Sequence, residues 1–142
     1  MSTEVDSSAL FAEEGLSVLP RVLGLGDRDP ASPTFGCFDR NYWHYRTTDF
    51  PCAWFQGAGL LMTLAHHLQI PENSYAGKPK LQDWSEAALD YLMRIQRNDG
   101  SFDEAYPYER SFCATAFSAY FFTEICLMAR RHLPARAGRT AE

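Results

Sequence analysis

An excess of basic charge is the first feature that this sequence lacks. Its 142 residues include 13 lysines and arginines against 18 aspartates and glutamates, which gives a formal net charge of -5. A protein that binds nucleic acid needs a basic face for the phosphates. The composition therefore predicts that nucleic acid is not a partner.

Paired metal-binding motifs are also missing. No CxxC or CxxH pair occurs among the four cysteines, which are Cys37, Cys52, Cys113 and Cys126. Neither a zinc site nor a redox motif is indicated, and we expect no metal and no cofactor. His66 and His67 are adjacent on a predicted helix and diverge by about 100°, so we expect them to be partly exposed and to share no metal. Free cysteines behave as small core residues, and we expect buried thiols.

A leader sequence is the third missing feature, because residues 1–6 contain neither a basic start nor an apolar run. We therefore expect a cytoplasmic protein. One apolar run, from Phe112 to Met128, has the length of a membrane span. Glu124 interrupts it and the sequence has no second run of this kind, so we expect a fully buried helix and no membrane contact.

Apolar residues recur at helical spacing in four stretches, and none alternates as a strand would. The stretches run from a cap at Ser7 or Ser8 to Leu19, then over 54–68, 81–97 and 112–128, with Pro20, Pro71 and Gly100 among the residues that end them. We predict one all-α domain over residues 1–142, with about four main helices in antiparallel hairpins and loose ends at 1–7 and 131–142. Residues 27–33, rich in proline and charge, predict a linker.

The segment from Gly36 to Cys52 fits no helical or strand period. It holds six aromatic rings, counting His44, together with two arginines, two aspartates and two cysteines. Long irregular loops in compact domains are functional or disordered, and this segment is too aromatic for disorder. It is the first candidate site. Loop 99–110, which is also rich in carboxylates and rings, is the second, and the two would form one cleft if they lie at the same end of the helices.

The run AALDYLMRIQRNDGSF, from Ala87 to Phe102, is followed by the small residues Ala114-Thr115-Ala116. It resembles the repeat of α/α-toroid proteins, in which a helix ends in glutamine, Asp-Gly-Ser and an aromatic follow, and the next helix begins with small residues. Terpenoid cyclases, protein prenyltransferases and heparinase II/III-type polysaccharide lyases share this architecture. The resemblance implies a partial α/α toroid, with this chain as the N-terminal portion of a larger one.

The residues of this repeat also predict a specific turn. Gln96, near the helix end, can bond to the backbone of the turn, and Gly100 supplies the left-handed conformation. Phe102 can fold back onto the helix pair. These residues are therefore expected to brace the corner between two helices.

Residues 38–49 resemble the region that precedes the toroid helices in heparinase-type lyases. Those enzymes use a tyrosine and a histidine, often with an asparagine or arginine, to remove a proton beside a uronic acid carboxylate. A lyase must neutralise that carboxylate, take the proton and protonate the leaving oxygen. The resemblance implies catalytic roles for Tyr42, His44, Tyr45 and Arg46. Asp39, Arg40, Asn41 and Trp43 of the same segment are the candidate contacts with a poly- or oligosaccharide. Asp103, Glu104 and Tyr106 of loop 99–110 are the other half of the proposed two-loop site.

Other functions are also compatible with the sequence. The carboxylates of the two loops would suit glycoside hydrolysis if two of them lie about 5–10 Å apart. Terpenoid cyclase chemistry is a further alternative, although the sequence has no DxDD or DDxxD run. The aromatic rings of segment 36–52 could instead seal the end of a bundle.

A non-catalytic helical module, binding carbohydrate or another subunit, is the alternative from a different class. Four helices are too few to cover an almost wholly apolar last helix on all sides. We therefore expect the chain to associate with further helices or with a partner subunit.

Overall fold

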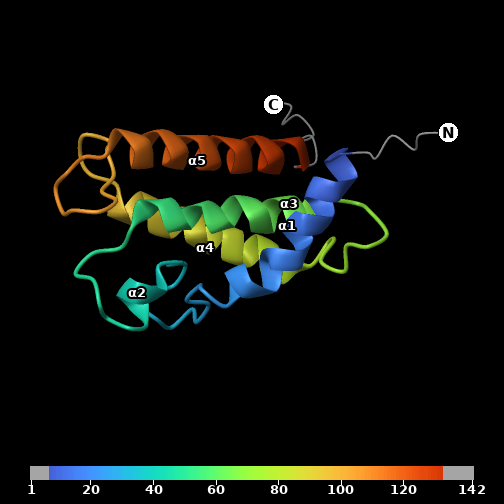
Figure 1. Ribbon diagram of the computed structural model, residues 1–142, viewed down its shortest axis with the longest axis horizontal. Helices are drawn as coiled ribbons and strands as arrows, with labels where there is room; N and C mark the ends of the chain where they lie inside the picture. Colours follow the sequence, from blue (N-terminus) through green and yellow to red (C-terminus); the bar gives the residue numbers. More distant parts are fainter. Residues whose placement is uncertain (1–6, 133–142) are drawn as a thin grey trace, which may run out of the picture.

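A computed structural model of the chain describes residues 7–132 (Figure 1). Within that range the chain is helical and has no strand, which confirms the all-α prediction with about four main helices. Of the predicted loose ends, residues 7 and 131–132 are helical, and the others lie outside the described residues. The elements in chain order are α1 (Ser7–Leu23), α2 (Arg40–Trp43), the 3-10 helix η1 (Ala53–Gly57), α3 (Ala58–His67), α4 (Pro79–Ile95) and α5 (Phe112–His132).

Helix α1 continues through Pro20, where the sequence predicts its end. Proline costs one helical hydrogen bond, but the last turn is held by tertiary packing, since Leu19 is fully buried and Val22 and Leu23 pack against the same core. Gly24 then closes the helix, because its N–H donates to the carbonyls of the last turn. The packing of the last turn of α1 therefore outweighs the tendency of Pro20 to end the helix.

Helices α3 and α4 form an antiparallel hairpin that contains the main core (Figure 1). Helix α4 begins with Pro79 in its first turn, where a missing N–H costs nothing. In the loop between the helices, the buried Asn73 amide donates to the carbonyls of Ala65 and Leu68, both at 2.7 Å, and so satisfies the end of α3. The buried core cluster consists of Leu19, Phe38, Met62, Ala65, Leu81 and Ala88.

The turn after α4 has the predicted corner brace. The Gln96 side-chain amide donates to the Gly100 carbonyl at 3.0 Å, and Gly100 has a φ of 85°. Phe102 is buried in a second core cluster with Ala53, Leu92 and Ala114. This prediction is confirmed.

Helix α5 lies beside α3 and runs antiparallel to α4, and its packing is against α3 and η1 (Figure 1). Two glycines allow the close approach: a Cβ at Gly57 would lie 2.5 Å from the Phe121 ring, and one at Gly59 would lie 3.2 Å from Ile125 Cδ1. Of the described helices, Phe112–Arg131 alone has the length and composition to cross a membrane, and 17% of its most apolar window is buried. The prediction of a fully buried helix is therefore wrong, because its neighbours cover one side.

Residues 27–37 form a closed loop rather than a simple linker. The buried Asp27 carboxylate accepts hydrogen bonds from the hydroxyls of Ser32 (2.5 Å) and Thr34 (2.6 Å). Its backbone N–H donates to the Cys37 carbonyl at 2.8 Å, and its carbonyl accepts from Gly36 at 2.9 Å. The loop is thereby fixed at both ends.

The cysteines differ from the expected uniform burial. Cys37 is buried and Cys52 half-buried, whereas Cys113 and Cys126 are exposed on α5. Burial raises the pKa of the Cys37 thiol to about 11, which leaves it protonated and unreactive at neutral pH. The two exposed thiols follow from the incomplete cover of α5.

Candidate functional site

Asp39 organises the aromatic segment as a helix cap. Its Oδ1 accepts hydrogen bonds from the N–H groups of Asn41 (3.1 Å) and Tyr42 (3.4 Å), which begin the short helix α2. Its Oδ2 accepts from the Cys52 N–H at 2.9 Å. A buried carboxylate in this position satisfies three backbone donors. Asp39 therefore closes the segment on itself, which is a structural role.

Arg40 and Trp43 attach the same segment to the end of α1. The Arg40 guanidinium donates to the Gly24 carbonyl at 3.0 Å, and the Trp43 indole donates to the Leu25 carbonyl at 2.8 Å. Arg40 also lies over the Tyr45 ring, 5.3 Å from its centroid. The Arg40 guanidinium and the Trp43 indole, which were predicted to contact a substrate, therefore bind the protein's own backbone.

The predicted catalytic side chains do not gather in one cavity. Tyr45 lines a cavity of about 220 Å³ beside Asp39, Arg40 and Asn41, whereas Tyr42, His44 and Arg46 are not among its lining residues. His44 is exposed and contacts the ring of Tyr45, with 4.9 Å between centroids. Arg46 is exposed in the left-handed region, with a φ of 56°. Adjacent residues on one short helix and its end point in different directions.

In loop 99–110, Asp103 holds the backbone together. The Arg97 guanidinium donates to both carboxylate oxygens, at 2.8–3.1 Å, and the N–H groups of Tyr108 and Arg110 donate at 3.0 and 3.1 Å. These partners, Arg97 first, lower the pKa of Asp103 to about 2. Asp103 is thus a structural carboxylate in this loop.

The other acids of the loop are bonded in the same way. Glu109 accepts the N–H groups of Glu104, Ala105 and Tyr106, which lowers its pKa. Glu104 accepts the Ser111 hydroxyl at 3.0 Å. The Tyr106 ring is exposed. Of the three predicted substrate contacts in this loop, Tyr106 is therefore the one whose side chain is directed to solvent.

The two candidate loops lie at the same end of the bundle (Figure 1). Just after the first loop, the Ala53 N–H at the start of η1 donates to the Asp103 carbonyl at 3.4 Å. The cavities of the two loops are separate, however, because the one beside loop 99–110, of about 340 Å³, is lined by Arg97, Asn98, Asp99 and Arg110. The two loops therefore lie at one end, but neither of these two cavities is lined by Asp103, Glu104 or Tyr106, and the predicted side chains do not share a cleft.

Asp103 gives the loop a predictable dependence on pH. A carboxyl group whose folded pKa is about 2 and whose ordinary value is 3.8 stabilises the fold above pH 3.8, and the contribution is lost as the pH falls toward 2. We expect Asp103→Ala to lower the unfolding free energy by about 2 kcal/mol at pH 6, from the loss of charged hydrogen bonds. Urea unfolding should show that the difference from wild type shrinks below pH 3.

Asp49 provides the control, because it is exposed in the same end of the molecule. Asp49→Ala should leave the stability unchanged within about 0.5 kcal/mol. A difference between Asp103→Ala and wild type that is the same at pH 6 and pH 2 would contradict the role of the ionised carboxylate.

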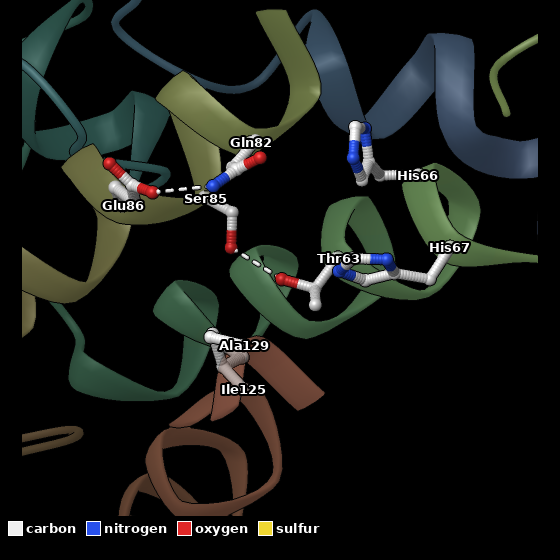
Figure 2. A pocket seen from close by; sticks show the side chains of 8 residues that line it. All are labelled: Thr63, His66, His67, Gln82, Ser85, Glu86, Ile125 and Ala129. Atoms are coloured by element: carbon white, nitrogen blue, oxygen red, sulfur yellow. Dashed lines mark hydrogen bonds between the residues drawn. The ribbon is translucent and has the colours of Figure 1, made fainter. Parts of the chain in front are cut away.

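A further cavity, of about 420 Å³, lies between α3, α4 and α5 (Figure 2). In it the hydroxyls of Thr63 and Ser85 lie 2.6 Å apart and both contact the Gly59 carbonyl, while Gln82 donates to Glu86 at 3.0 Å. His66 bonds to the Lys78 carbonyl through Nδ1, at 3.0 Å. This pair of hydroxyls was not predicted from the sequence, although Thr63 and Ser85 each place a hydroxyl within the apolar stripe of a predicted helix. Because both hydroxyls are bonded within the protein, they bind the helices together.

Helix α5 presents an outer face that no described element covers. Its residues recur at steps of three or four, as one side of a helix does. No charged side chain lies on this face before Arg130. A helix side in contact with water normally carries charge. The outer face consists of the exposed residues Phe112, Cys113, Ala116, Ala119, Tyr120, Thr123, Cys126, Leu127 and Arg130.

Comparison of the chain with protein-family models, with curated protein sequences and with solved structures finds no match. A functional conclusion therefore depends on the geometry of this chain.

Proposed function

We propose that this chain is a non-catalytic helical module that joins protein subunits through the outer face of α5. The observation that carries the proposal is the exposure of a 20-residue apolar helix, of which 17% of the most apolar stretch is buried. Leaving apolar area in water costs about 25 cal/mol per Å². Contiguous exposed apolar surface of this kind marks an interaction site in a soluble protein.

The rest of the geometry supports a module more than a lyase. Asp39, Arg40, Trp43 and Asp103 bond to the backbone or to other side chains of this chain. A lyase needs its base, its acid and its carboxylate-binding group around one substrate position. The side chains proposed for these roles lie around the short helix α2 without a common cavity.

The enzymatic alternative has a direct test. We expect wild-type protein to leave polyuronates and glycosaminoglycans uncleaved, as followed by the absorbance of the unsaturated product. Tyr42→Ala and His44→Ala should fold normally, because His44 is exposed and Tyr42 half-buried. If the wild-type protein cleaves one of these polymers and His44→Ala does not, the proposal of a non-catalytic module is wrong and a lyase function takes its place.

Association through α5 can be mapped by photo-cross-linking in cells. A photoreactive phenylalanine analogue is placed on the outer face, at position 120 or 127, and on exposed positions of other helices, at 13 or 86. We expect protein adducts from 120 and 127 and none from 13 or 86, because the apolar face is the covered one. Equal yields from all four positions, or no adduct at all, would contradict the proposed function.

A further inference from the structure

We infer that the partner seated on the outer face of α5 is a second copy of this chain, with the two α5 helices antiparallel. This inference rests on the proposed function and specifies its partner. A two-fold interface uses the same patch on both copies. The outer face must therefore be complementary to itself, and its pattern of size and charge can be checked for this.

Apolar overlap fixes the register of such a pair. The apolar part of the outer face runs from Phe112 to Leu127, so its midpoint lies between Ala119 and Tyr120. An antiparallel pair centred there places Phe112 at the level of the partner's Leu127. It also places Ala116 at the level of the partner's Thr123 and Tyr120 at the level of the partner's Ala119, so each tyrosine meets a small side chain at the middle.

Charge supports the antiparallel direction. Past the apolar stretch, Arg130 at the end of α5 is brought toward the partner's loop 99–110, which carries four carboxylates, two of them paired with Arg97 and Arg110. The same contact occurs twice, because the pair is symmetric. In a parallel pair the arginines would meet each other and the acidic loops would also meet. Opposite charges at both ends therefore favour the antiparallel arrangement.

The exposed area is at the low end of what a dimer needs. Phe112, Tyr120 and Leu127 are 87%, 55% and 39% exposed. With about 200 Å² for a large side chain, these three supply roughly 350 Å², and the small residues of the face add to this. A standard interface takes about 800 Å² from each partner. We therefore expect a reversible dimer whose affinity depends on the end charges.

A lipid surface suits the face less well. The acidic loop at the start of α5 would lie against the headgroups, and the chain has a net charge of -5, whereas binding to anionic membranes needs a basic flank. A second copy of the chain would cover the apolar middle of the outer face and bring opposite charges together at both of its ends.

Spin labels on the native Cys113 measure the helix direction. The full chain is used, with Cys37, Cys52 and Cys126 replaced by alanine or serine and the fold checked by circular dichroism. In the antiparallel register the two copies of Cys113 are separated by about 13 helical positions, which is about 20 Å along the axis at 1.5 Å per residue. A parallel pair would bring them to about 10 Å. We expect the longer separation in double electron–electron resonance.

Outer-face variants test the surface by sedimentation equilibrium. Ala116→Glu should weaken the dimer at least tenfold, because in each copy it places a carboxylate in the apolar interface, at the level of the partner's Thr123. Ala129→Glu is the matched control, since Ala129 is exposed on the same helix but borders the cavity of Figure 2. It should leave the dimer intact. The pair Arg130→Glu and Arg131→Glu should weaken the dimer about tenfold at low salt and much less at high salt.

The outcomes separate this inference from the proposed function. A monomer at every concentration, a 10 Å label separation, or equal effects of Ala116→Glu and Ala129→Glu would overturn antiparallel self-association. Adducts from position 120 to a different protein would overturn the self-association and leave the association function standing. Binding of the monomer to neutral or anionic phospholipid vesicles, lost in Ala116→Glu, would overturn both.

Discussion

Replacing Gly36 with alanine is expected to lower the unfolding free energy by about 4 kcal/mol or more, which is at the upper end for a single substitution. Gly36 has a φ of 90°, and an added Cβ would lie 2.0 Å from the carbonyl oxygen of Ala87 in α4. The left-handed conformation alone costs an alanine about 1–2 kcal/mol. The clash adds to this, because a helix carbonyl is held by its own hydrogen bond and cannot move aside.

Gly77→Ala is the matched control for that prediction. Gly77 also has a positive φ, of 66°, but no atom lies within 4 Å of the position of its Cβ. It should cost about 1 kcal/mol, from the conformation only. Urea unfolding followed by circular dichroism compares the two variants with wild type. Similar losses in both would show that the approach of segment 36–52 to α4 is looser than the structure indicates.

Removing the Asp39 carboxylate is expected to have the second largest effect, about 3 kcal/mol for Asp39→Ala. The N–H groups of Asn41 and Cys52 lose their acceptor, while the Tyr42 N–H keeps the Asp39 carbonyl at 3.1 Å. A backbone donor left without a partner costs about 1–3 kcal/mol. Asp39→Asn should cost roughly half as much. One of its two oxygens becomes an amide, so it cannot serve both the start of α2 and the Cys52 N–H.

Hydrogen exchange at the Cys52 amide gives a local readout of the same bond. It should become faster in both Asp39 variants and stay unchanged in Asp29→Ala. Asp29 is exposed, and its carboxylate accepts one backbone bond, from Ala31 at 2.9 Å. Asp29→Ala should therefore cost about 0.5 kcal/mol. An Asp39→Ala variant as stable as Asp29→Ala would return Asp39 to the candidates for ligand binding.

Local patterns in the sequence predicted much of this fold. The stripe of Leu81, Ala88 and Leu92 marks α4 because its apolar residues recur at helical spacing, and the brace of Gln96 and Gly100 depends on neighbours in the chain. Features that depend on contacts between residues far apart in the sequence could not be predicted from these local patterns. The end of α1 beyond Pro20 follows from burial of Leu19, which no local rule contains.

The candidate site shows the same division. Segment 36–52 was recognised by its composition, and its position beside loop 99–110 follows from antiparallel helices. The role of Asp39 was not predictable, because the four-residue helix that it caps is too short to give a period. Asp103 was assigned to a substrate because its loop is rich in carboxylates and rings. Its partner Arg97 was expected to face water, so their ion pair was not predicted. Hydrophobicity gave the apolar character of α5, and the count of four helices predicted incomplete cover. Which side stays open depends on its packing against α3 and η1.

The close contact of α5 with Gly57 and Gly59 sets how far its outer face stands from the core. Phe121 and Ile125, near the middle of a helix about 30 Å long, rest directly on the backbone of η1 and α3. A methyl group at Gly59 would lie 3.2 Å from Ile125 Cδ1, so that side chain must give by a few tenths of an ångström. In the proposed association, Gly59 would therefore influence the packing of α5 from the side that faces away from the partner.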